Sequence, residues 1–75
     1  METRQIKLQV PEEVKDFVKA AEKCDFDIDI FYNRIIVDAK SFLGVLSLDL
    51  SKTLSVACRG YDQEFEGVLN KYAVC

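Results

Sequence analysis

Residues 37–48 read VDAKSFLGVLSL and form the most distinctive stretch of this 75-residue chain. They concentrate large apolar side chains in a segment too short for a long helix, namely Phe42, Leu43, Val45, Leu46 and Leu48. Ser41 stands directly before them, where its hydroxyl can cap a helix running from Phe42 to about Leu48. Because a short helix buries only one face, the remaining apolar side chains require another explanation.

The N-terminal third of the chain predicts a strand followed by a helix. Residues 3–10 alternate between polar and apolar, which is typical of a strand whose apolar side is formed by Ile6, Leu8 and Val10. Pro11 suits the first helical position, and Glu12 and Glu13 follow where acids interact well with the helix dipole. The helix is expected to reach about Lys23, because apolar residues recur at helical spacing at Val14, Phe17, Val18 and Ala21.

The remainder predicts a hairpin, a further strand and a last helix. Residues 26–32 alternate strongly, and residues 35–39 form the returning strand after a turn at Asn33 and Arg34, since Asn tolerates positive φ. A fourth strand covers residues 53–58 and ends before Gly60. Asp62 can cap a final helix, whose apolar stripe consists of Phe65, Val68, Leu69 and Tyr72.

This βαββαβα order predicts an α+β fold in a single domain spanning residues 1–75. The strands are expected to form a four-stranded antiparallel sheet with the helices on one face and solvent on the other. Asp27 and Asp29 would then point to solvent beside Phe31. No third ligand accompanies this acidic pair, so we interpret it as a solvated strand face rather than a metal site.

Composition excludes several classes of function. The net charge of −3 and a pI near 4.8 argue against non-specific binding to nucleic acid. No apolar run approaches the roughly 20 residues that cross a bilayer, and the polar N-terminus METRQIKLQV does not resemble a signal peptide. We therefore expect a cytoplasmic protein with neither nucleic-acid nor membrane partners.

The sequence offers little catalytic chemistry. It contains no histidine, and its three cysteines, Cys24, Cys58 and Cys75, are widely spaced without a CxxC pair. A disulfide scaffold and a zinc site are therefore not expected, and the cysteines are interpreted as packing or terminal thiols. Neither a nucleophile–base pair nor a Gly-rich phosphate loop can be assembled. We predict a protein that is not an enzyme and that holds no metal or cofactor.

Three segments carry a resemblance to a known family: KCDFDIDIFYN at 23–33, VDAKSFLGVLSLDLSK at 37–52, and Gly60-Tyr61-Asp62. They resemble the HPr family, the histidine-containing phosphocarriers of the bacterial sugar phosphotransferase system. The resemblance implies an HPr-like open-faced β-sandwich, with three helices over one face of a four-stranded antiparallel sheet. A ferredoxin-like fold shares much of this order and ranks second, because its second helix should be much longer than the one predicted here.

In that family a neutral imidazole at the start of the first helix accepts a phosphoryl group, beside an arginine and the helix N-terminus. An ungapped alignment extended back from Lys23 places Val10 at the histidine position, Glu12 at the arginine position and Glu13 at a proline position. Carboxylates there would repel a phosphate. Because the chain has no histidine anywhere, we predict that it cannot act as a histidine phosphocarrier in any alignment.

The resemblance also implies a docking surface on the second helix, which in HPr proteins contacts enzyme I, sugar-specific IIA domains and regulators. Phe42, Leu43 and Leu46 match those contact positions, and Leu43 and Leu46 are spaced i, i+3. Val45 and Leu48 are the expected anchors in the core. The alternative is that all these side chains cover a small domain with little core of its own.

Ser41 matches a serine that a dedicated kinase phosphorylates in some bacteria, which makes HPr a partner of a catabolite-control transcription factor. A phosphate at a helix N-terminus gains from the dipole and the free amides. The alternative is an unmodified helix cap, which contributes about 1 kcal/mol by itself.

Two classes of function remain. The first is a non-catalytic, HPr-like binding or regulatory protein that uses the surface of residues 41–48, with partners among phosphotransferase-system components or a catabolite-control regulator. The second is a functionally drifted structural or oligomerising module with no role in that system. In either class the chain is expected to be a monomer or a weak dimer.

Overall fold

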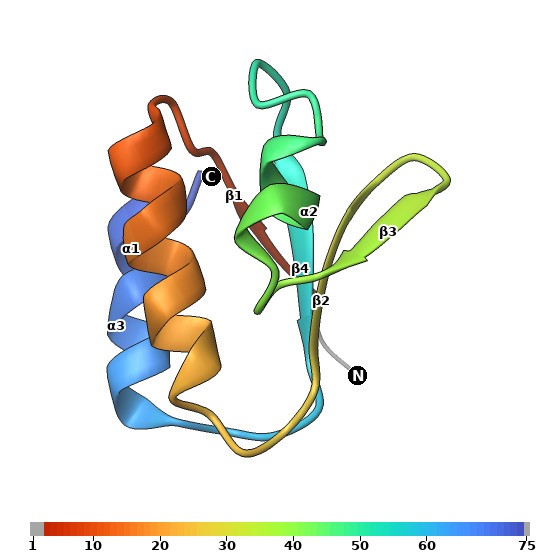
Figure 1. Ribbon diagram of the computed structural model, residues 1–75. Helices are drawn as coiled ribbons and strands as arrows, with labels where there is room; N and C mark the ends of the chain where they lie inside the picture. The colour runs from red at the N-terminus through yellow and green to blue at the C-terminus, as the bar shows by residue number, and fades with distance from the viewer. Residues whose placement is uncertain (1–2, 75) are drawn as a thin grey trace.

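The computed structural model describes residues 3–74 and confirms the predicted βαββαβα order (Figure 1). Its elements are β1 (Thr3–Ile6), α1 (Pro11–Glu22), β2 (Ile28–Tyr32), β3 (Ile35–Asp38), α2 (Phe42–Leu46), β4 (Leu54–Cys58) and α3 (Gln63–Tyr72). Cys75, interpreted above as a terminal thiol, lies outside the described residues. Within residues 3–74 no helix combines the length and apolarity that crossing a bilayer requires.

The four strands form one antiparallel sheet in the order β1-β4-β2-β3. The helices lie on one face of it, with α1 and α3 side by side and α2 between α1 and the β2–β3 hairpin (Figure 1). The predicted stripe of α1 is buried, and Phe17 from that stripe packs against Phe65 of α3 with ring centroids 5.7 Å apart. Burying these apolar side chains is the main driving force for the packing of helices on the sheet.

The predicted helix caps and turn are confirmed in detail. The N–H of Phe65 donates to Asp62 Oδ2 at 2.9 Å, and the N–H of Gly44 donates to Ser41 Oγ at 3.1 Å. Asn33 has a φ of 56°, as the turn between β2 and β3 requires. These features depend on a few neighbouring residues, which explains why the sequence predicts them.

The first strand is shorter than predicted. It ends at Ile6, the last residue paired with β4, because β4 itself begins at Leu54 opposite Ile6. Leu8 stays buried as expected, but Val10 is 45% exposed and forms the N-cap of α1 without a side-chain hydrogen bond. Between Ile6 and Pro11 the chain leaves the sheet to reach the helix layer. The alternating sequence pattern therefore runs past the end of the strand itself.

The second helix also ends earlier than predicted, at Leu46 rather than near Leu48. Ser47 Oγ donates to the carbonyl of Gly44 at 2.6 Å, and the N–H of Leu48 bonds to the carbonyl of Val45 at 3.1 Å. These i to i+3 bonds tighten the last turn. Leu48 remains buried all the same, because that turn directs it into the core.

The two edges of the sheet differ. The edge at β1 is covered by the chain after α3: Ile6 bridges Ala73, the N–H of Lys7 donates to the carbonyl of Tyr72, and the N–H of Val74 donates to the carbonyl of Gln5. The edge at β3 pairs with no strand or bridge among residues 3–74. In Figure 1, β3 projects away from the helices at the outer side of the sheet.

Candidate functional site

The α2 segment is fixed at both ends. Val45 and Leu48 are the anchors, as predicted, with 0% and 4% of their surface exposed. Before the helix, Lys40 Nζ donates to the carbonyl of Cys24 at 2.9 Å, which ties the segment to the end of α1. The backbone N–H of Lys40 donates to Asp38 Oδ1 at the same distance. The helix therefore presents its outer face in a defined position.

The three side chains predicted to bind partners do not behave alike. Leu43 is 77% exposed, and Phe42 lies at the surface with 37% exposed. Leu46, in contrast, is only partly exposed and packs against the core. Leu46 is the last residue of α2 and packs at the edge of the core. The structure thus brings Phe42 and Leu43 to the accessible surface and leaves Leu46 at its border.

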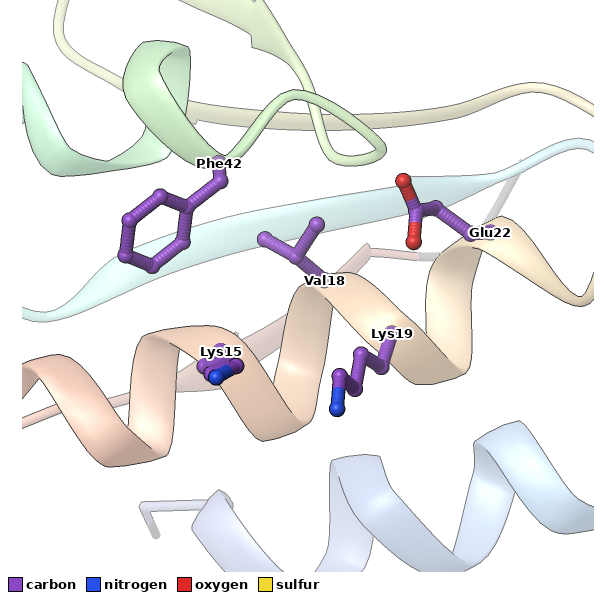
Figure 2. A pocket seen from close by; sticks show the side chains of 5 residues that line it. All are labelled: Lys15, Val18, Lys19, Glu22 and Phe42. Carbon is purple, nitrogen blue, oxygen red and sulfur yellow. The ribbon is translucent and has the colours of Figure 1, made fainter.

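A shallow hollow of about 280 Å³ lies between α1 and the start of α2 and is lined by Lys15, Val18, Lys19, Glu22 and Phe42. Figure 2 shows the Phe42 ring extending from the start of α2 toward α1, which carries Val18 and both lysines. Lys15 and Lys19 were not predicted from the sequence to belong to a site. Their i, i+4 spacing beside the apolar stripe was the available signal, but only packing places them next to Phe42.

The start of α1 carries an apolar N-cap and two acidic residues. Val10 is the N-cap, and Glu12 is exposed in the first turn. The carboxylate of Glu13 accepts a hydrogen bond from the N–H of Gln9 at 2.7 Å. The first turn of α1 therefore carries two carboxylates, and one of them bonds to the backbone just before the helix. The correspondence of these residues to the family's histidine, arginine and proline stays a prediction.

The two described thiols are poor nucleophiles. Burial, with a contribution from the Glu66 carboxylate, raises the pKa of Cys58 to about 11. Burial also raises the pKa of Cys24, whose Sγ donates to the carbonyl of Ala20 at 3.6 Å. Both are free and protonated at neutral pH. Across residues 3–74, no cluster of three or more His, Cys, Asp or Glu residues could hold a metal ion.

The acidic pair at the start of β2, Asp27 just before the strand and Asp29 within it, lies at the solvent side of the sheet. Asp27 is exposed, and Asp29 is half-buried, with Oδ2 3.8 Å from the guanidinium of Arg59, which directly follows β4. This ion pair gives Asp29 a neighbour of opposite charge on the sheet surface. The interpretation as surface charge fits this geometry.

No protein-family profile matches the sequence. Several solved structures share the fold. HPr-C-His from Thermoanaerobacter tengcongensis matches with a TM-score of 0.76 and 23% identity, over 95% of this chain and 89% of that one. The phosphocarrier protein HPr from Bacillus anthracis matches with a TM-score of 0.71 and 22% identity, over 97% and 96%.

A third similar structure is Crh, the catabolite repression containing protein of Bacillus subtilis, with a TM-score of 0.64 and 19% identity over 95% of this chain and 88% of that one. That protein was crystallised as a domain-swapped, intertwined dimer. Identities at this level establish the fold alone. The chain has the open-faced β-sandwich fold of the HPr phosphocarriers, as the sequence resemblance implied.

Proposed function

We propose that this chain is a non-catalytic, HPr-like binding or regulatory protein that docks a protein partner on the surface formed by Phe42, Leu43 and the hollow beside α1. Three observations support the proposal: the HPr-like fold, the resemblance of residues 37–52 to the HPr family, and a surface that stays apolar and exposed after folding. Its partners are expected among phosphotransferase-system components or catabolite-control regulators in the cytoplasm.

The observation that carries the proposal is the exposure of Leu43. A leucine with 77% of its surface in water gains almost nothing from folding, since the hydrophobic contribution depends on area removed from water. It stands directly beside Phe42, which forms one wall of the hollow. Exposed apolar residues grouped around a hollow and rimmed by charge are typical of protein interaction sites.

Charge around the hollow suggests the chemistry of the partner. Lys15 and Lys19 are exposed on its α1 side, and Glu22 lies further along the same helix. Two ammonium groups beside an apolar wall favour a partner that presents an apolar side chain flanked by carboxylates. Such charges mainly raise the association rate and the specificity, while the buried apolar contact supplies most of the affinity.

The chain does not act as a histidine phosphocarrier under this proposal. The phosphoryl acceptor is missing because the sequence has no histidine, and Glu12 and Glu13 place negative charge at the start of α1. Incubation with phosphoenolpyruvate and enzyme I should leave the mass of the chain unchanged. Stoichiometric addition of an acid-labile phosphoryl group would contradict this part of the proposal. Val10→His should restore little activity, since Glu12 still takes the place of the arginine.

Ser41 has a structural role that needs no modification, because its Oγ caps α2 through Gly44. The hydroxyl is also exposed, as a kinase substrate must be. We therefore expect partner binding without phosphorylation, and phosphorylation of Ser41 would act as an added regulatory signal. Ser41→Ala separates the capping role from a role in phosphorylation. The variant should be less stable by about 1 kcal/mol because the cap is lost, but it should still bind the partner that the unphosphorylated protein binds.

The test is affinity capture from an extract of the source cells, comparing the wild type with Leu43→Asp. A charge in the core of a desolvated interface costs several kcal/mol, so the variant should lose the captured proteins. Tyr61→Asp is the matched control, because Tyr61 is equally exposed on a different surface, before α3. Capture that is unaffected by Leu43→Asp, or absent from the wild type, would favour the drifted structural or oligomerising module.

A further inference from the structure

The free edge of β3 carries an exposed apolar pair that the docking surface does not use. Ile35 is 55% exposed and Ile36 is 65% exposed, although both lie within a strand. They alternate in direction, so Ile36 lies opposite Phe31 on the solvent face of the sheet and Ile35 lies opposite Tyr32 on the helix side. Natural edge strands are usually protected by charge, proline, a bulge or a covering segment.

Backbone hydrogen bonding leaves this edge available. The N–H of Ala39 donates to the carbonyl of Ile28 at 2.9 Å, which fixes the phase of the β2–β3 ladder. In an antiparallel pair the hydrogen-bonded positions alternate, so Val37 and Ile35 also turn toward β2. Ile36 therefore directs its N–H and C=O outward, as does Asp38, whose carbonyl already accepts a bond from the N–H of Ser41.

The sequence of the edge is complementary to itself. Residues 34–38 read RIIVD, with a positive charge at one end and a negative charge at the other. If two copies pair antiparallel about Ile36, each Ile36 meets its equivalent, and each Arg34 lies opposite Asp38 of the second copy. This register also allows backbone hydrogen bonds between the copies, because the N–H and C=O of Ile36 point outward and can bond to the C=O and N–H of Ile36 in the second copy. A register shifted by one residue would place outward-facing backbone groups opposite inward-facing ones, and it would no longer place Arg34 opposite Asp38.

The carboxylate of Asp38 accepts a hydrogen bond from the N–H of Lys40, but it faces another carboxylate within the same chain. It stands directly across from Asp29 in the β2–β3 register, and like charges in directly opposed positions destabilise a sheet. Asp29 is paired with Arg59, whereas Asp38 has no ion-pair partner among residues 3–74. The guanidinium of Arg34 from a second copy would supply the missing positive charge.

From the free edge, its phase and its charge pattern, we infer that the chain self-associates through antiparallel β3–β3 pairing, centred on Ile36, into one continuous sheet. The two Ile36 side chains and the adjacent Phe31 residues would form an apolar strip across the solvent face. The pairing joins only five residues from each copy. The surface area that it buries is therefore well below the roughly 1,200 Å² of a stable interface, so the dimer is weak and in rapid exchange. This inference is independent of the proposed function, because α2 takes no part in it.

Sedimentation equilibrium of the purified chain with a reductant present is the first test, and a dissociation constant of about 0.1–1 mM is expected. Ile36→Pro removes the outward N–H and should abolish association with little loss of thermal stability, because proline is tolerated at a free edge. Val37→Pro is the matched control, since its N–H faces β2 and its loss should destabilise the monomer. A wild type that stays monomeric at about 1 mM overturns the inference.

Charge reversal tests the register itself. Arg34→Asp alone and Asp38→Arg alone each place like charges opposite one another, so each should weaken association about tenfold. An equal mixture of the two variants should associate again, because both charge pairs are then opposite in sign. Circular dichroism confirms that each variant is folded. If the mixture does not associate, pairing about Ile36 in this register is wrong.

Alternative assemblies give different results. A domain-swapped dimer would exchange slowly on dilution and would tolerate Ile36→Pro. Concentration-dependent amide shifts in ¹⁵N spectra should map to residues 34–38 and to their neighbours on β2. If the shifts map instead to α1 and α2, or if Ile36→Pro leaves association intact, the β3 edge is not the contact between copies.

Discussion

The hydroxyl of Tyr72 donates a hydrogen bond to Asp16 Oδ2 at 2.7 Å and links the last turn of α3 to the middle of α1. Lys71 Nζ approaches the same oxygen at 3.3 Å. The Tyr72 hydrogen bond, with help from Lys71, holds the pKa of Asp16 below its ordinary value. Burial and the Asp16 carboxylate raise the pKa of Tyr72. This cluster connects two helices that are distant in sequence.

The first prediction is an acid dependence of stability that originates at Asp16. Because its pKa is lower in the folded state, the carboxylate stabilises the fold fully above its unfolded pKa of about 3.9 and loses this effect as pH falls below that value. Asp16→Asn should lower the free energy of unfolding by about 1 kcal/mol at pH 7, since solvent screens a half-exposed site. The difference should disappear near pH 2, as measured by urea unfolding. A difference that is constant across this range would contradict the prediction.

The second prediction concerns the two faces of α2. Leu43→Asp should leave the melting temperature nearly unchanged, because its side chain is already in water. Val45→Asp should unfold the domain, because it buries an unpaired carboxylate in the core. Leu46→Asp should be intermediate, since Leu46 packs only partly against the core. Thermal melts of the three variants decide the order. Collapse of the Leu43→Asp variant would remove the docking surface from consideration.

The third prediction compares two glycines. A Cβ at Gly60 would lie 2.6 Å from Cδ2 of Phe26, whose ring packs against the core, so Gly60→Ala should cost roughly 1–3 kcal/mol. A Cβ at Gly67, in the exposed part of α3, would meet nothing within 4 Å. Gly67→Ala should therefore stabilise the protein by about 0.5–1 kcal/mol. Denaturant titration of both variants provides the measurement, and equal effects at the two sites would refute the packing assignment.

The fourth prediction concerns the reactivity of Cys58. With a pKa of about 11, its thiolate fraction at pH 8 is far smaller than that of an unperturbed cysteine with a pKa near 8.5. Alkylation by iodoacetamide in the folded protein should therefore be about 100-fold slower than in urea. Peptide mapping by mass spectrometry identifies the labelled site. Labelling of native Cys58 at the unfolded rate would show that burial does not protect this thiol.

Much of the fold was predictable because its determinants are local. The stripes at Val14–Ala21 and in the last helix depend on helical periodicity, and the caps at Ser41 and Asp62 depend on residues within one turn. Pro11 marked the start of α1 correctly for the same reason. The assignment of Val45 and Leu48 as anchors also followed from spacing alone. A pattern that repeats with the geometry of one element needs no knowledge of its neighbours.

The errors arise where the neighbours decide. Val10 continues an alternating pattern, yet it is exposed, because the chain has left the sheet by then and Val10 forms the N-cap of α1. Leu46 was predicted at the accessible surface, but at the end of α2 it packs partly against the core. Neither outcome depends on the residue's own type or spacing. Each depends on where a helix begins or ends.

The sequence by itself therefore determined the order of elements, the helix faces that enter the core, and the absence of a histidine that could carry a phosphoryl group. Tertiary structure alone decided that β1 pairs with β4 and that Lys15 and Lys19 come beside Phe42. It also decided that, within residues 3–74, the β3 edge has no partner while the β1 edge is covered. The physical reason is that strand pairing and surface exposure are set by contacts between residues far apart in the chain, which local propensity and periodicity do not encode.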